Sequence, residues 1–239
     1  MLRAKRWMLM ALTLGTLLPA QAAVVTLSGA NFVLRYDEAR LGGFGAPQLV
    51  GDSVYFTFNN LLAQSLNGAG SVTVSALLQG VELQMSGGLL FGGLQAGVFG
   101  DYLMRGVNSL VALSGSVGTI DLGNASDTVS YAALALSPDT PLTVKDGLSH
   151  DFSAGAANAA DAGASSVGIE WLSTLTATTS GSSGRRQALI EQKFSGLQLT
   201  VMAVPTPTTS ALAALGLLLL AWRRRDAAGN TTMRRSDHA

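Results

Sequence analysis

The stretch Val81-Glu82-Leu83-Gln84-Met85 decides the fold, because apolar and polar residues alternate in it without a break. Alternation with a period of two places every second side chain on the same face of an extended strand. An apolar face of this kind must be covered by another layer. Three more runs share the pattern: Val54-Tyr55-Phe56-Thr57-Phe58, Ser71-Val72-Thr73-Val74-Ser75 and Leu197-Gln198-Leu199-Thr200-Val201. The sequence therefore predicts strands that each bury one face.

Further runs of the same kind are separated by Gly, Asn, Asp and Ser, which favour turns. They fall near residues 32–36, 110–113, 117–122, 129–136, 167–175 and 188–194. About ten strands with turns between them are typical of two antiparallel sheets packed face to face. We therefore predict an all-β fold over residues 23–203, an antiparallel β-sandwich that is jelly-roll-like.

Three stretches of this domain are predicted to be loops. Residues 87–106 mix Gly-Gly pairs with apolar residues, and residues 153–166 are almost all Ala, Gly, Ser and Asn. Residues 176–184 are rich in Ser, Thr and Gly. Glycine supplies the positive φ that tight turns need, and small side chains bury little apolar surface. We expect the second stretch to form a long loop and the third to precede the last hairpin.

The first 22 residues have the three parts of a secretory signal. Three basic residues lie within the first six, and an apolar run covers residues 7–18. Ala20 and Ala22 precede Ala23 with the spacing of a signal peptidase site. We therefore predict a signal helix, delivery through the secretion translocon, and cleavage by signal peptidase between Ala22 and Ala23.

A second hydrophobic segment lies near the other end, at residues 211–222, and is followed by Arg223, Arg224 and Arg225. A helix of about a dozen residues is ~18 Å long, which is short of the ~30 Å hydrocarbon layer of a bilayer. The arginines should stay on the cytoplasmic side. We predict a hydrophobic helix that anchors the chain transiently in the membrane, with the domain outside.

The order of a proline pair, a short apolar run and an arginine cluster resembles the PEP-CTERM sorting signal of bacteria that make extracellular polysaccharide. The pair lies in Val204-Pro205-Thr206-Pro207, and the resemblance covers residues 204–225. Thr206 stands where the family pattern has Glu, and a polar tail, residues 226–239, follows the arginines. The resemblance implies that an exosortase, a membrane cysteine transpeptidase-like enzyme, removes the tail during export or surface attachment. A single weak transmembrane anchor without processing is the alternative.

The charge of the domain narrows the choice of partners. Residues 23–203 hold thirteen acidic and seven basic residues, which gives a net charge of −6. This sign opposes docking on nucleic acid or anionic lipid through the net charge. The chain has no cysteine, which excludes disulfides, thiolate catalysis and sulfur-ligated zinc.

No catalytic residue and no cofactor is predicted. Ser149, His150 and Asp151 are consecutive, so on a strand their side chains point to alternate faces and do not converge as a triad. Calcium prefers oxygen ligands of the kind that aspartates offer. Four aspartates lie in a loop-rich stretch without the spacing of a calcium-binding loop, at Asp139, Asp146, Asp151 and Asp161. We prefer solvated turn aspartates to a structural calcium ion.

Exposed aromatic rings are the usual basis of carbohydrate binding on a sandwich, because a ring offers a large apolar face. Trp171 alternates in step with Val167 and Ile169, which predicts that it lies in the core. Tyr55 lies on the opposite face of its strand from Val54 and Phe56, and is the candidate aromatic residue of a ligand-binding face.

These observations predict an exported, non-enzymatic protein of the cell surface or extracellular matrix, sorted by an exosortase-like system and linked to exopolysaccharide or biofilm. One rival is a carbohydrate-binding module for extracellular polysaccharide, which an exposed aromatic row on one sheet face would favour. Another is a secreted hydrolase, which two or more carboxylates within about 5–10 Å of each other would favour.

Overall fold

The computed structural model describes residues 23–181, 184–204 and 217. In these residues the chain forms twelve strands and one turn of 3-10 helix, η1, at Glu38–Arg40. The strands are β1 (Val24–Ser28), β2 (Phe32–Asp37), β3 (Gln48–Val50), β4 (Ser53–Leu66), β5 (Gly70–Met85), β6 (Leu89–Arg105), β7 (Ser109–Asp121), β8 (Ser130–Ala133), β9 (Ala135–Leu136), β10 (Asp146–Asn158), β11 (Ser166–Thr179) and β12 (Gln187–Ala203). The prediction of an all-β domain is confirmed.

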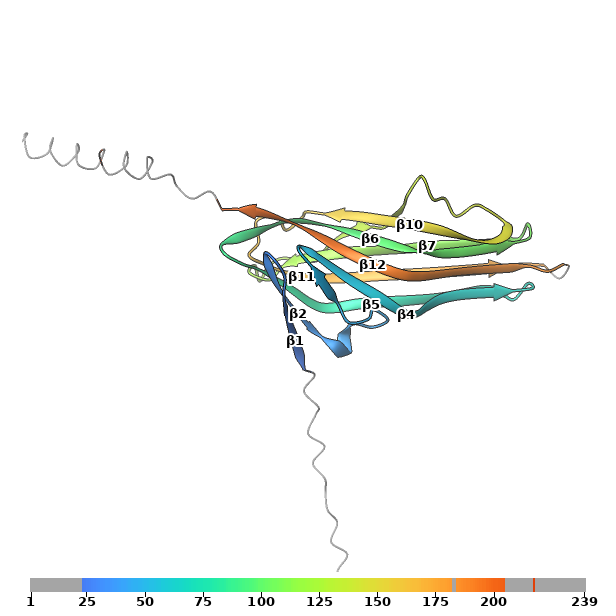
Figure 1. Ribbon diagram of the computed structural model, residues 1–239, viewed down its shortest axis with the longest axis horizontal. Coiled ribbons are helices and arrows are strands. Elements are labelled where there is room, and N and C mark those ends of the chain that lie inside the picture. Colours follow the sequence, from blue (N-terminus) through green and yellow to red (C-terminus); the bar gives the residue numbers. More distant parts are fainter. Residues whose placement is uncertain (1–22, 182–183, 205–216, 218–239) are drawn as a thin grey trace, which may run out of the picture.

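The strands form two antiparallel sheets that pack face to face (Figure 1). The sheet that we call the β5 sheet has the order β1-β2-β5-β11-β7-β8, and the β6 sheet has the order β3-β4-β12-β6-β10-β9. The pairs are nested, since β4 pairs with β12, β5 with β11, and β6 with β10. The chain therefore runs out and back as one long folded hairpin, and the predicted antiparallel sandwich is confirmed.

The alternation that predicted the strands sets which side chains face the other sheet. On β5, Val81, Leu83 and Met85 are buried, while Glu82 and Gln84 between them are exposed. The inner faces of the two sheets together supply one continuous hydrophobic core. Burial of these side chains is the main favourable contribution to the stability of the sandwich.

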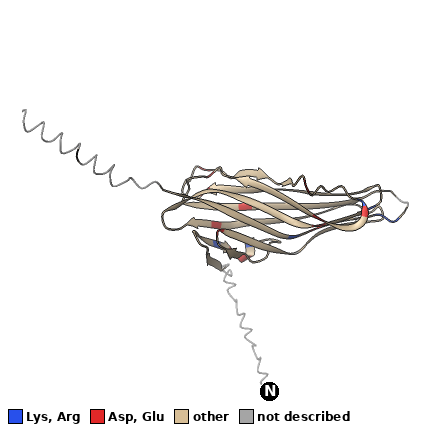
Figure 2. Cartoon of the chain, turned by 45° about the horizontal axis from the view of Figure 1, so that its top comes forward, with Lys and Arg blue, Asp and Glu red and all other residues tan. Residues whose placement is uncertain are grey.

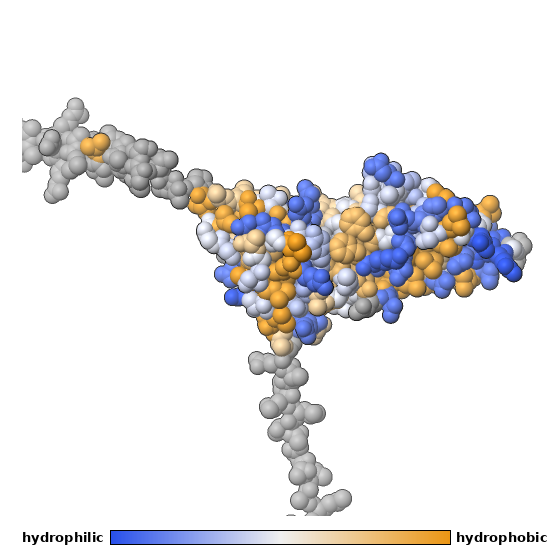
Figure 3. All heavy atoms as spheres, in the orientation of Figure 1, coloured by the Kyte–Doolittle hydropathy of each residue, from blue (hydrophilic) through white to orange (hydrophobic). Residues whose placement is uncertain are grey.

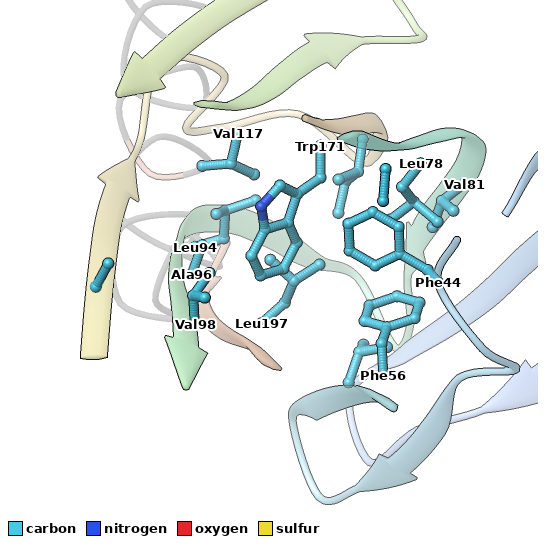
Figure 4. Packing of buried hydrophobic residues seen from close by; sticks show 14 of the residues in the cluster. Phe44, Phe56, Leu78, Val81, Leu94, Ala96, Val98, Val117, Trp171 and Leu197 are labelled. Carbon is cyan, nitrogen blue, oxygen red and sulfur yellow. The ribbon is translucent and has the colours of Figure 1, made fainter. Parts of the chain in front are cut away.

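Trp171 of β11 lies at the centre of this core and has no exposed surface (Figure 4). Its ring centroid is 5.6 Å from that of Phe44 and 6.5 Å from that of Phe56, which comes from the opposite sheet. Tilted and edge-on ring pairs at these distances are favourable. The prediction that Trp171 belongs to the core is confirmed.

The expectation of loops at residues 87–106 was wrong, because this stretch contains β6, an inner strand of the β6 sheet. β6 pairs with β12 on one side and with β10 on the other. Phe91, Val98 and Tyr102 are buried beneath it. Backbone pairing on both edges and these apolar side chains outweigh the weak strand preference of its glycines.

The other two loop predictions were wrong for about half of their length, over residues 153–158 and 176–179. β10 continues to Asn158, so only the turn after it, residues 159–165, lies outside a strand. β11 continues to Thr179 and pairs along its whole length with β5 and β7. Small residues suffice in these strands, because the neighbouring strands supply the hydrogen bonds and the larger side chains.

Every strand pair and every core residue of the described part lies between residues 24 and 203. This segment therefore has its own complete hydrophobic core and has what it needs to fold by itself. The signal helix at residues 1–22 and the hydrophobic helix at residues 211–222 are predictions that lie outside the described residues, apart from Leu217. Within the described residues, no helix has the length and apolar character needed to cross a bilayer.

Candidate functional site

Three aromatic rings form a row on the outer face of the β6 sheet. They are Tyr55 of β4, Phe194 of β12 and Phe99 of β6, which are neighbouring strands. The ring centroids of Tyr55 and Phe194 are 5.4 Å apart with an angle of 24° between the planes, and those of Phe99 and Phe194 are 6.0 Å apart at 42°. Phe99 keeps 49% of its surface exposed although it lies in the middle of the sheet.

A row of glycines runs beside these rings. Tyr55 is in register with Gly196, Gly196 with Gly97, and Gly97 with Gly155, so three adjacent strands carry no side chain at this level. Both Gly97 and Gly196 lie close under a ring. A Cβ atom on Gly196 would be 3.0 Å from the ring of Tyr55, and one on Gly97 would be 3.2 Å from the ring of Phe99.

Polar side chains border the glycine row on its other side. Two residues further along the strands, Ser53 of β4 faces Gln198 of β12, and Gln198 faces Gln95 of β6. Aromatic rings, glycines and amides together line a hollow of about 320 Å³ that is open to solvent. We call this hollow the furrow.

Charged groups lie beyond the aromatic row, away from the furrow. Glu191 is in register with Asp101, and Asp101 with Asp151. Lys193, the extra residue of a bulge in β12, forms an ion pair with Asp101. Its hydrogen bond to this carboxylate raises the pKa of Lys193. The furrow itself is lined by uncharged side chains.

This arrangement suits a neutral ligand that has both apolar and hydroxyl-bearing faces. The exposed ring of Phe99 and the half-buried rings of Tyr55 and Phe194 can pack against C–H groups, and burying them against a ligand removes apolar surface from water. The amides of Gln95 and Gln198 each carry donors and an acceptor for hydroxyl groups. The absent side chains at the glycines let a ligand approach the sheet closely.

Sequence reasoning found one of the three rings. Tyr55 is half-buried on the outer face, as its alternation with Phe56 predicted. Phe99 was missed because it lies in the stretch that we expected to be loop. Phe194 belongs to a run that was predicted as a strand. Its position beside Tyr55 and Phe99 depends on the register between strands, which no local sequence pattern predicts.

Residues considered above for a catalytic triad and for a calcium site interact with other neighbours in the structure. His150 Nε2 lies 2.9 Å from Asp146 Oδ1, and this hydrogen bond is the main reason why the pKa of Asp146 is lowered. Asp161 lies instead beside Asp127. Among the residues that the structure describes, no group of three or more His, Cys, Asp or Glu side chains is arranged to hold a metal ion.

The predicted processing residues lie at the limits of the described chain. Ala23 is exposed just before β1, and Val204 is 46% exposed just after β12. Both chain ends therefore leave the sandwich at its surface. Ala20, Ala22, the rest of the proline motif at residues 205–207, and the arginine cluster at residues 223–225 lie outside the described residues.

Comparison with models of known protein families and with curated proteins found no match. Among solved structures, the chain is similar to the Eiger TNF from S. frugiperda, with 15% identity, coverage of 62% of this chain and 96% of the other, and a TM-score of 0.24. It is also similar to infectious bursal disease virus, Gx strain, with 13% identity, coverage of 82% and 55%, and a TM-score of 0.26. TM-scores this low assign the chain to neither group.

Proposed function

We propose that the protein is an exported, non-enzymatic carbohydrate-binding protein of the cell surface or extracellular matrix, and that its furrow binds a neutral stretch of extracellular polysaccharide. The observation that carries this proposal is the row of Tyr55, Phe194 and Phe99 beside the glycine row. Lone exposed rings are common on protein surfaces, but three contiguous rings that border a hollow are characteristic of binding surfaces. The nested strand pairing supports a jelly-roll-like description of the sandwich.

The export and sorting part of the proposal rests on the two ends of the sequence. A secretory signal before the domain and the PEP-CTERM-like segment after it would deliver the furrow to the compartment where polysaccharide accumulates. Exosortase processing is the proposed route to the surface, and signal peptidase and the translocon are the proposed partners in export.

The test is affinity electrophoresis of residues 23–204 in gels that contain polysaccharide purified from the surface of the native host. We expect the wild-type segment to be retarded. Phe99→Ala combined with Phe194→Ala should weaken binding by roughly tenfold or more, because aromatic anchors commonly dominate binding energy. Gly97→Val should have a similar effect, since its side chain would occupy the furrow next to Phe99.

Tyr131→Ala is the matched control, because Tyr131 is 57% exposed on β8 of the opposite sheet. Thermal unfolding of each variant confirms that the sandwich is intact. A wild-type segment that is not retarded by the host polysaccharide, or a Tyr131→Ala effect as large as that of the double variant, would reject the furrow as a carbohydrate site.

The register of Glu191, Asp101 and Asp151 favours the hydrolase as a second candidate. Side chains directly opposite each other on neighbouring strands lie about 5 Å apart at Cβ, so their carboxyl groups can reach the separation of roughly 5–10 Å that paired catalytic carboxylates have. Two features count against this candidate: Lys193 forms an ion pair with Asp101, and the row of carboxylates lies on an open sheet face. Release of new reducing ends from the host polysaccharide by wild type, and its loss in Asp151→Asn or Glu191→Gln, would replace the binding proposal with this one.

A further inference from the structure

The end of the sandwich formed by the β6–β7 turn and the start of β10 combines basic and apolar side chains. We call it the distal tip and define it by Arg105, Val107, Lys145, Leu148 and Arg186. Figure 2 shows Lys and Arg gathered at this end, at the right of the view, and Figure 3 shows hydrophobic and hydrophilic side chains next to each other there.

Three contacts connect the β6–β7 turn with the start of β10 and the segment before β12. Lys145 Nζ donates a hydrogen bond to the carbonyl oxygen of Val107 at 3.2 Å. The guanidinium of Arg105 lies over Gly147, whose positive φ of 80° and missing side chain leave room for it. The stem of Arg186 lies over Gly106 in the same way. The distal tip is therefore one continuous surface.

The charge of the domain is unevenly distributed along its length. Of the seven basic residues between 23 and 203, four belong to or border the distal tip: Arg105, Lys145, Arg185 and Arg186. Asp146 is the acidic residue at the start of β10, and it accepts a hydrogen bond from His150. The remaining sandwich holds three basic and twelve acidic residues. The net charge of −6 thus conceals a positive end, and the expectation that it opposes anionic lipid does not apply there.

Large apolar side chains project from the same surface. Val107 is 80% exposed and Leu148 is 64% exposed. Leu110, at the start of β7, adds a third at 58%. Transfer of such exposed apolar side chains from water into a non-aqueous phase lowers the free energy. Basic side chains beside them can keep their charged groups at the interface while their apolar stems lie in the non-aqueous phase.

The distal tip lies at the far end of the molecule from the point where the chain leaves the sandwich. Gln187, at the start of β12, pairs with Arg105 at the tip, and Ala203, at its end, pairs with Leu89. Seventeen residues of β12 separate the two ends, a length of roughly 55 Å at the rise of an extended strand. A surface bound at the tip would therefore leave the C-terminal segment and the furrow accessible.

We propose that the distal tip docks on an anionic phospholipid surface, with Val107 and Leu148 entering the headgroup region and Arg105 and Lys145 meeting lipid phosphates. Each basic side chain near an anionic bilayer adds electrostatic attraction. Shallow insertion of apolar side chains adds to that attraction. An acidic polysaccharide would match the charge but offers no apolar phase for the two exposed side chains, so lipid is the partner that accounts for both features.

The test is co-sedimentation of residues 23–204 with vesicles at low salt. We expect binding to vesicles of phosphatidylglycerol mixed with phosphatidylcholine, no binding to phosphatidylcholine alone, and loss of binding at 0.5 M salt because the charges are then screened. Arg105→Gln combined with Lys145→Gln should weaken binding at least roughly tenfold. Val107→Ser combined with Leu148→Ser should weaken it severalfold.

Matched variants at the other end of the molecule provide the controls. Arg35→Gln with Arg40→Gln removes the same charge, and Val50→Ser removes an apolar side chain that is 65% exposed. Neither should change vesicle binding. Equal binding to uncharged vesicles, equal losses in the control variants, or binding to soluble acidic polysaccharide without binding to vesicles would overturn the proposal. Salt dependence of the wild-type segment gives an answer even if a variant fails to fold.

Discussion

Asp161 lies in the turn between β10 and β11, close to two other carboxylates. Burial raises the pKa of Asp161, and the neighbouring Asp127 and Asp121 raise it further. Asp127 has the opposite shift, because the backbone N–H of Asp121 donates a hydrogen bond to it at 2.7 Å and lowers its pKa. The two carboxyl groups therefore differ in how strongly they hold a proton.

The raised pKa of Asp161 predicts a pH-dependent effect of Asp161→Asn. A carboxyl whose pKa is higher in the folded state contributes its full stability below the unfolded pKa and loses it as the pH rises through the folded pKa. Asparagine does not titrate, so the difference in melting temperature, variant minus wild type, should rise by a few degrees between pH 3 and pH 7. Thermal unfolding across this range measures it.

Asp139→Asn, at an exposed loop position, is the matched control for the substitution itself, and the rise at Asp161 is judged against it. A difference for Asp161→Asn that stays constant or falls with pH would show that the folded state does not disfavour the ionised Asp161 carboxylate.

At the scale of elements, β6 separates what local pattern predicts from what pairing decides. Its glycines resemble turn residues when the sequence is considered alone, yet the sheet requires one of them, Gly100. A Cβ on Gly100 would lie 2.0 Å from the carbonyl oxygen of Glu191 on β12. Gly97 instead forms part of the floor of the furrow. Neither of these two roles can be recognised without knowing which residues of the neighbouring strands lie beside the glycine.

The position of β6 inside its sheet predicts slow hydrogen exchange. Its amides are paired with β12 and β10, so those between Leu94 and Met104 should exchange only through global or near-global unfolding. The amides of the short edge strands β3 and β9 should exchange orders of magnitude faster. Hydrogen exchange followed by NMR measures both. Exchange of the β6 amides within minutes would contradict the inner-strand assignment.

The strands that were predicted from alternation share one property. In β4, β5 and β12, polar and apolar residues alternate because one face contacts the core and the other contacts water. The buried side chains of these strands can therefore be predicted from the local sequence. β10 lacks this signature because Ala and Gly serve on both of its faces. For such a strand, contacts with β6 supply what its own composition does not.

At the scale of the whole molecule, the hypothesis of signal peptidase and exosortase processing predicts the mass of the mature protein. Recovered from the surface or medium of its native host, the protein should lack the first 22 residues and the residues near and beyond Pro205. Intact mass spectrometry of membrane, surface and medium fractions measures this. A chain that still ends at Ala239 in the membrane fraction would favour a single anchor without processing.

The sequence by itself determined the all-β class, the antiparallel sandwich and the place of Trp171 in the core, because each depends on a period of two that is read along a few residues. It also supplied the signal and sorting predictions, which depend on contiguous segments. The tertiary structure decided the furrow and the distal tip. Phe99 and Phe194 lie 95 positions apart, as the numbering gives, and only the register of β6 with β12 sets them side by side. Register depends on the packing of a whole layer, since a shift of one residue would turn every buried side chain outward.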